Sequence, residues 1–223
     1  MTTAGVPAVL VMAKAPRPGT VKTRLHPLLG PERCAALQAE LIRHTLAVTS
    51  SYGLRTYVAY APGEAEGEDS TCDLAPSGVR PLLQRGGDLG QRLTAAVTDA
   101  YADGAGPLLV IGTDAPTLTG ELLAAARTAL EDRDVVLGPA LDGGYYLIGM
   151  RGPHTGLFGI DPALWSTDRV LAATRARADE HGLSVRLLPP LRDLDTPEDA
   201  AALLADPGLP DRIAALLHPA EPV

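Results

Sequence analysis

The sequence predicts an α/β fold of three layers, in which helices cover both faces of a mostly parallel sheet. Its apolar runs are continuous rather than alternating, which is typical of strands buried on both faces. These runs are 6–12, 54–61, 107–113, 134–140, 145–150 and 183–189. Helical patterns fall between them, and strands that alternate with helices of this length indicate βαβ units.

The predicted helices follow the strands in order. Segment 31–51 repeats Cys34, Leu37, Leu41, His44 and Val48 at helical spacing. The other helices are expected at 90–103, 119–131, 167–181 and 197–205, with a weak strand at 79–84. Thr196 and Pro197 form a typical helix start, as N-cap and first helical residue. A short helix is expected after Leu209, with a frayed end at 218–223, and the acidic segment 62–78 is expected to be a surface loop.

Composition limits the kind of protein. A chain of 223 residues suits one domain, with a core over 6–205 and a tail over 206–223. The two cysteines have no metal-binding spacing, no signal peptide is evident, and no run is long enough to span a membrane. We therefore expect a cytoplasmic protein. A net charge of −8 argues against a general nucleic-acid binder. A homodimer is one possible assembly, and the sequence does not decide the oligomeric state.

A cationic loop follows the first strand, in the segment MAKAPRPGTVKTRL (12–25). It is not a P-loop, because Gly19 and Lys22 are separated by two residues and no earlier glycine has the required spacing. Prolines stiffen the loop, and Gly19 allows a close backbone approach. Lys22 and Arg24 would then bind a polyphosphate. The alternative is a solvated basic loop.

Carboxylates follow two later strands, and in open α/β sheets ligands bind at the carboxyl ends of strands. Asp114 comes directly after the apolar run LLVIGT, where it would hold Mg²⁺ or Mn²⁺ against phosphate oxygens. The alternative is that Asp114 caps the next helix, although Thr117 and Thr119 lie closer to it. Asp193 and Asp195 precede the last helix, and one of them is the expected second metal ligand; the sequence does not choose between them.

Glycine-rich segments would complete a nucleotide and acceptor site. The sequence RGGDLGQRL precedes a helix, and we assign Ala13, Lys14, Gln84, Gly87 and Asp88 to nucleotide binding along with the cationic loop. The turn Asp142-Gly143-Gly144-Tyr145 would bind the acceptor, although a plain hairpin explains its glycines equally well. Trp165 is either a wall of this site or a core residue. The histidines have no zinc-hydrolase spacing.

The segments AKAPRPGTVKTRL, GGDLGQRL, IGTDAPTL, GPALDGGYYLIG, WST and DLDTPEDAAALL, in this order, resemble a bacterial family of GT-A-fold proteins labelled as uncharacterised or arsenosugar-biosynthesis glycosyltransferases. The wider superfamily includes molybdenum-cofactor guanylyltransferases and phospholactate or phosphoenolpyruvate guanylyltransferases. The resemblance implies a GT-A, nucleotide-diphospho-sugar transferase type of fold. It also implies phosphate binding by Gly19, Lys22 and Arg24, and metal binding by Asp114 with Asp193 or Asp195.

Two departures affect the expected donor. The first loop lacks the GxGxR run of the nucleotidyltransferases, and Pro116 replaces the second acid of the glycosyltransferase DxD motif. We predict a metal-dependent nucleotidyltransferase that moves NMP from an NTP to a small acceptor carrying a phosphate or other oxyanion, with Lys22, Arg24 and Asp114 as catalytic residues. The alternatives are glycosyl transfer from a nucleotide sugar and a non-catalytic nucleotide-binding protein.

Overall fold

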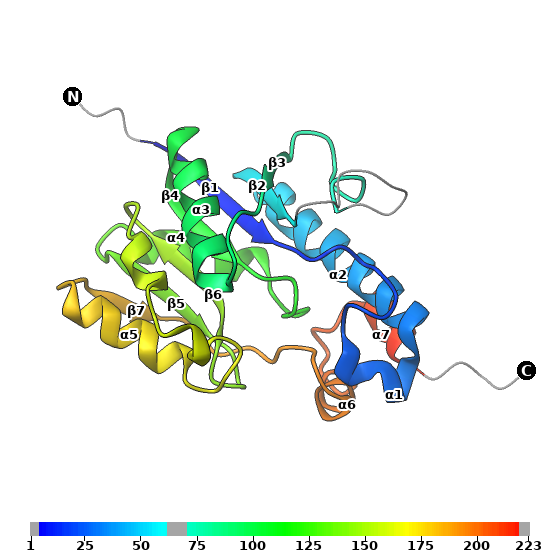
Figure 1. Cartoon of the computed structure of the whole chain (residues 1–223). Helices are drawn as coiled ribbons and strands as arrows, with labels where there is room; N and C mark the ends of the chain where they lie inside the picture. Colours follow the sequence, from blue (N-terminus) through cyan, green and yellow to red (C-terminus); the bar gives the residue numbers. More distant parts are fainter. Residues whose placement is uncertain (1–4, 62–70, 219–223) are drawn as a thin grey trace, which may run out of the picture.

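The computed structural model describes residues 5–61 and 71–218, which form a sheet covered on both faces by helices (Figure 1). The sheet has seven strands in the order β3-β2-β1-β4-β6-β5-β7. The strands are β1 (Val6–Met12), β2 (Arg55–Tyr60), β3 (Arg80–Leu83), β4 (Ala105–Ile111), β5 (Val135–Pro139), β6 (Tyr145–Met150) and β7 (Val185–Leu187). The predicted fold class is confirmed.

The main helices lie close to the predicted ranges. They are α2 (Pro31–Ser51), α3 (Leu89–Ala102), α4 (Gly120–Ala129), α5 (Val170–Glu180), α6 (Pro197–Leu204) and α7 (Asp211–Leu217). Among the described residues the structure adds α1 (His26–Leu29) and three short 3-10 helices, which are too short to have a periodic pattern: Thr23–Leu25, Thr155–Phe158 and Pro162–Leu164. The predicted loop 62–78 lies outside the described residues as far as 70, and the frayed end does so from 219.

Strand direction departs from parallel at one place. β6 is antiparallel to both of its neighbours, β4 and β5, whereas all other strand pairs are parallel. A turn over residues 140–144 joins β5 to β6, so this segment is a hairpin. The hairpin reverses the chain without a crossover helix, which explains why no helix separates these two strands.

Alternating side chains of the strands build a core on each face of the sheet. In β1, Ala8 and Leu10 face the side covered by α3 and α5, while Val9 and Val11 face the side covered by α2 and α4. A third apolar cluster, which we call the C-terminal cluster, joins α2 to α6 and α7 and includes Leu25 and Leu194. These two residues lie just beyond Lys22 and Asp193, so this cluster supports the two chain segments that carry Lys22 and Asp193.

Within residues 5–61 and 71–218, no helix combines the length and apolarity needed to cross a bilayer.

Candidate active site

A cavity of about 480 Å³ opens at the carboxyl ends of β1 and β4. Because β1 and β4 are parallel, the segments that follow them leave the sheet at the same edge. The wall combines the cationic loop with residues after β4, the β5–β6 turn, the segment around Trp165 and the segment before α6. From the predicted site residues it includes Ala13, Lys14, Lys22, Arg24, Gln84, Asp114, Asp142, Gly144, Tyr145, Trp165, Asp193 and Asp195.

The cationic loop is held rigidly at its start. The buried Gln84 side chain donates hydrogen bonds to the carbonyl oxygens of Ala13 and Ala59, at 3.0 and 2.8 Å. Farther along the loop, Gly19 has a φ of 80° in open space. The loop leaves Lys14 and Arg24 exposed at the cavity, with no ion-pair partner among the described residues. These two cations are therefore available to an anionic ligand.

Lys22 has a different environment from the other cations of the loop. Its Nζ donates to Asp114 Oδ1 at 2.5 Å, to the Leu194 carbonyl oxygen at 2.8 Å and to Asp195 Oδ1 at 3.1 Å. The side chain is only 4% exposed. Burial alone lowers the pKa of Lys22, but the two carboxylates outweigh it and raise the pKa above its ordinary value. Each hydrogen of the ammonium thus has an acceptor, and two of the three acceptors are aspartate oxygens.

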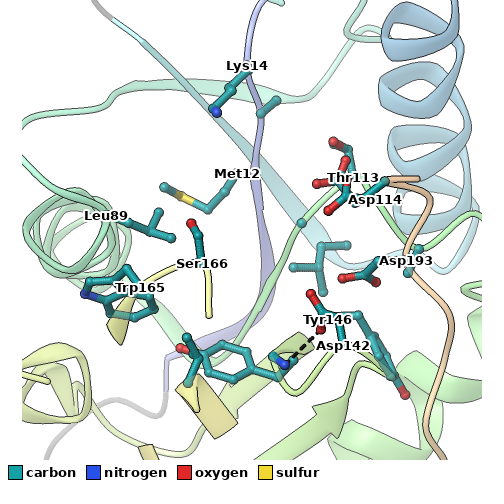
Figure 2. Close-up of a pocket in the computed structure, with 18 of the residues that line it drawn as sticks. Met12, Lys14, Leu89, Thr113, Asp114, Asp142, Tyr146, Trp165, Ser166 and Asp193 are labelled. Atoms are coloured by element: carbon teal, nitrogen blue, oxygen red, sulfur yellow. Dashed lines mark hydrogen bonds between the residues drawn. The ribbon is translucent and has the colours of Figure 1, made fainter. Parts of the chain in front are cut away.

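Four aspartates, Asp114, Asp142, Asp193 and Asp195, line the same cavity, and we call them the carboxylate cluster. Asp193 differs from the other three, because its Oδ1 is inaccessible to solvent and has no hydrogen-bond partner. Burial, followed by the charges of Asp114, Asp142 and Asp195, raises the pKa of Asp193 to about 8. Figure 2 shows Asp193 between Asp114 and Asp142. The cluster is therefore short of positive charge.

The carboxylate cluster fits a divalent cation, which prefers carboxylate oxygens as ligands. An orphaned, buried carboxylate oxygen on Asp193 is the observation that carries this fit. Across residues 5–61 and 71–218, no three acidic, histidine or cysteine side chains are already gathered around one metal-sized point. The ammonium of Lys22 lies between Asp114 and Asp195 and forms an ion pair with each, so these two acids do not meet at a common point.

The opposite wall of the cavity is apolar. Met12, Leu89 and Trp165 lie together on the side away from the carboxylate cluster, with Ser166 beside them (Figure 2). Trp165 lines the cavity and also packs against the core on the α3 side of the sheet. Its position therefore fits both a site wall and a core residue. It is wedged against α3, since a Cβ on Gly90 would lie 2.9 Å from its Nε1. The cavity therefore offers a charged end and an apolar end.

Several predicted residues do not line the cavity: Gly19, Gly87, Asp88 and Gly143. Asp88 is the N-cap of α3, where its side chain accepts from the Gln91 N–H at 2.9 Å. Gly143 has a φ of 91°, and a Cβ there would lie 2.2 Å from the Asp168 carbonyl oxygen. It therefore shapes the turn that presents Asp142.

Sequence reasoning missed some wall residues, notably Met12, Leu89, Thr113 and Ser166. Thr113 is the residue before Asp114, and Gln38 donates to its hydroxyl at 3.2 Å. Ser166 belongs to the WST segment and has a φ of 64°. Lys22, at 49°, is the other non-glycine residue with positive φ among the described residues. Both line the cavity, and strained backbone of this kind concentrates at functional sites.

The fold and the site define an α/β protein of the nucleotide-diphospho-sugar transferase type. Residues 45–167 match the family described as "Uncharacterized protein conserved in bacteria (DUF2064)", and the chain belongs to this family. The crystal structure of a Desulfovibrio desulfuricans G20 protein, assigned as a nucleotide-diphospho-sugar transferase, is 33% identical with a TM-score of 0.80. The match covers 89% of this chain and 86% of that one.

Two further relatives extend the comparison. The chain is 29% identical over 192 residues to a phosphoenolpyruvate guanylyltransferase of Sphaerobacter thermophilus, a match covering 84% of this chain and 88% of the relative. A cytidylyltransferase of Leptospira borgpetersenii has the same fold, with a TM-score of 0.60, 15% identity and coverage of 96% and 93%. The predicted resemblance is confirmed, and the chain is an enzyme of the transferase class.

Proposed function

We propose that this protein is a metal-dependent nucleotidyltransferase that transfers NMP from a nucleoside triphosphate to a small acceptor carrying an oxyanion. The observation that carries this proposal is the shared cavity, which exposed Lys14 and Arg24 line together with the carboxylate cluster. Lysine and arginine bind phosphate oxygens, and Mg²⁺ is held by one or two carboxylates together with phosphate oxygens. The relationship to a guanylyltransferase supports the same chemistry.

In this reaction an acceptor oxygen attacks the α-phosphorus, and the bond from that phosphorus to the bridging oxygen of the β-phosphate breaks, which releases pyrophosphate. Lys14 and Arg24 would stabilise the charge that develops on the leaving pyrophosphate. Asp114, Asp193 and Asp142 would hold Mg²⁺ or Mn²⁺, which when bound neutralises charge on the phosphate oxygens. The apolar wall around Met12 and Trp165 would exclude water from the transfer and bind the uncharged part of a substrate.

Pyrophosphate release tests the proposal. The protein is incubated with each common nucleoside triphosphate, Mg²⁺ or Mn²⁺ and a panel of small phosphorylated and carboxylated acceptors. We expect release that requires both metal and acceptor, and a loss of about 100-fold or more in kcat/KM for Asp114→Asn. The matched control is Asp179→Asn, an exposed acid on α5 that does not line the cavity. Equal activity of the two variants would contradict the role of Asp114.

Glycosyl transfer is the second candidate, favoured by the relationship to a protein assigned as a nucleotide-diphospho-sugar transferase. The same panel separates the two, because a glycosyltransferase would consume nucleotide sugars and release a nucleoside diphosphate instead of pyrophosphate. A non-catalytic nucleotide-binding protein would turn over neither class of donor. It would also retain nucleotide binding in the Asp114→Ala variant.

A further inference from the structure

We propose that the ammonium of Lys22 is a resident cation of the carboxylate cluster, which leaves the site room for a single divalent ion. The proposal rests on the metal dependence proposed above and gives Lys22 a positioning role in place of phosphate contact. It follows from where the ammonium lies, how it is held, and what remains for a metal.

All three hydrogens of the Lys22 ammonium have acceptors. Asp114 Oδ1, Asp195 Oδ1 and the Leu194 carbonyl oxygen lie at 2.5, 3.1 and 2.8 Å from Nζ. These acceptors come from two segments that are 92 and about 170 residues away in the sequence, after β4 and before α6. The ammonium therefore joins these segments as a bound metal ion would.

The backbone holds Lys22 in this orientation. Lys22 precedes the 3-10 helix Thr23–Leu25 in a left-handed conformation, with φ 49° and ψ 39°, and its carbonyl oxygen accepts from the Leu25 N–H at 2.8 Å. Leu25 is fully buried in the C-terminal cluster. For Lys22 to swing toward a phosphate, its buried side chain would have to leave both carboxylates, and Leu25 restrains the backbone next to it.

The remaining oxygens define where a divalent ion enters. Asp193 keeps a buried oxygen without a partner, and Asp142 lies beyond it on the side facing away from Asp114 (Figure 2). Among the described residues, the one hydrogen bond of the Asp142 carboxylate is the one it accepts from the Gly144 N–H, at 2.9 Å. Asp195 pairs its Oδ1 with Lys22, as Asp114 does. The available ligands are thus Asp193, Asp142 and the second oxygens of Asp114 and Asp195.

The charge count gives the stoichiometry. Lys22 together with one divalent ion leaves the four ionised carboxylates with one net negative charge. A second divalent ion would make the cluster positive beside Lys14 and Arg24, at distances where like charges repel strongly in a partly buried site. One divalent ion is therefore the number that the cluster accepts while Lys22 is present.

Mn²⁺ binding without nucleotide tests this inference, with electron paramagnetic resonance counting the bound ions per chain. We expect one ion in the wild type. Lys22→Ala removes both the charge and the side chain, and we expect a second ion to bind in the vacated position. Adding n-propylammonium to that variant should restore a stoichiometry of one. Lys22→Met keeps the position filled, and we expect one ion there.

Several outcomes would overturn the inference. Two ions in the wild type, or one ion in Lys22→Ala, would show that Lys22 does not occupy a cation position. A second ion in Lys22→Met would place that ion elsewhere. No bound Mn²⁺ in any form would instead remove the proposed metal dependence on which the inference rests, so the two failures are distinguishable.

The wild type alone provides a second measurement, which remains available if the Lys22→Ala variant does not fold. A buried, hydrogen-bonded ammonium exchanges slowly, so ¹H–¹⁵N spectra selective for lysine side chains should show Lys22 Nζ. We expect this signal to persist when the protein is saturated with diamagnetic Mg²⁺. Its disappearance on metal binding would mean that the ion displaces Lys22, which contradicts the proposal.

Discussion

Asp193 and Lys22 differ in whether their polar atoms have partners within this site. Lys22 is fully paired, whereas Asp193 keeps an unpaired buried oxygen among like charges. A buried carboxylate in such a position lowers the stability of the metal-free fold, and it persists in enzymes because it binds a ligand. Stability and function should therefore respond in opposite directions when Asp193 is changed.

We predict this opposition for Asp193→Asn. At pH 9 and without metal, the free energy of unfolding should rise by about 1 kcal/mol or more, because a buried charge is removed. Mn²⁺ affinity should fall at least about tenfold, because a ligand is lost. Urea denaturation and Mn²⁺ titration measure the two quantities. A variant that is less stable and binds Mn²⁺ normally would rule out this role.

The pH dependence of stability gives a second prediction at this scale. The pKa of Asp193 is about 8 in the folded chain and 3.8 as its ordinary value, so the folded chain keeps a proton that the unfolded chain releases. Without metal, the free energy of unfolding should fall as pH rises from about 4 to about 8, by at most about 1.4 kcal/mol per pH unit.

The difference between wild type and Asp193→Asn isolates this contribution, measured by urea denaturation across the pH range. Saturating Mn²⁺ should remove the fall in stability toward pH 8, because the metal binds the ionised carboxylate. A difference that is flat between pH 5 and 8 would mean that Asp193 is not the group concerned.

Among the elements, the β5–β6 turn is the one whose shape most directly sets the site. Gly143 donates its N–H to the Ala140 carbonyl oxygen, and its own carbonyl oxygen accepts from the Leu171 N–H. The turn thus contacts the backbone of Asp168 and Leu171, which follow Trp165 and Ser166 in the sequence. Its neighbour Asp142 gains its orientation from this contact and from the Gly144 N–H.

We predict that Gly143→Ala lowers the free energy of unfolding by about 2 kcal/mol or more. The added Cβ would meet the Asp168 backbone at 2.2 Å, where no flexible side chain can yield, and the φ of 91° adds strain. Gly182→Ala is the matched control, with a positive φ of 64° but open space around its Cβ. It should lose only about 1 kcal/mol.

Thermal and urea denaturation of the two variants provide the comparison. Equal losses in both would show that backbone conformation, and not the contact with Asp168, limits position 143. Mn²⁺ affinity should fall in Gly143→Ala alone, because only that variant displaces the turn that presents Asp142.

For the whole molecule, the C-terminal cluster connects the end of the chain to the start of the site. α7 packs on α2, and Arg33 donates to the carbonyl oxygens of Ala215 and Leu216 at 2.9 and 2.8 Å. Leu25, three residues after Lys22, lies in the same cluster as Ile213. The C-terminal helix therefore supports the loop that holds Lys22.

We predict that Ile213→Ala lowers the free energy of unfolding by about 2–5 kcal/mol, because Ile213 is completely buried. It should also weaken Mn²⁺ binding through Leu25 and Lys22. Leu204→Ala, at a position that is 37% exposed on α6, is the control and should lose less than about 1 kcal/mol. Urea denaturation measures both, and a loss below 1 kcal/mol in Ile213→Ala would contradict the support that we assign to α7.

Local pattern was enough to predict much of this fold. The bounds predicted for β1, β6 and α2 coincide with those observed, because continuous apolar runs and helical spacing are properties of the segments themselves. The edge of the sheet that carries the site was also predictable, since ligand-binding groups gather where parallel strands end. The roles of the individual site residues remain predictions.

The sequence by itself determined the fold class, the main elements and the set of charged residues that meet at one edge of the sheet. Only the tertiary structure decided the reversed direction of β6 and the place of Lys22. The pairing of β6 with β4 depends on hydrogen bonds between segments that lie far apart in the sequence. Lys22 points to Asp114 and Asp195 because of a left-handed backbone and acceptors that lie 92 and 173 residues away, which no local pattern contains.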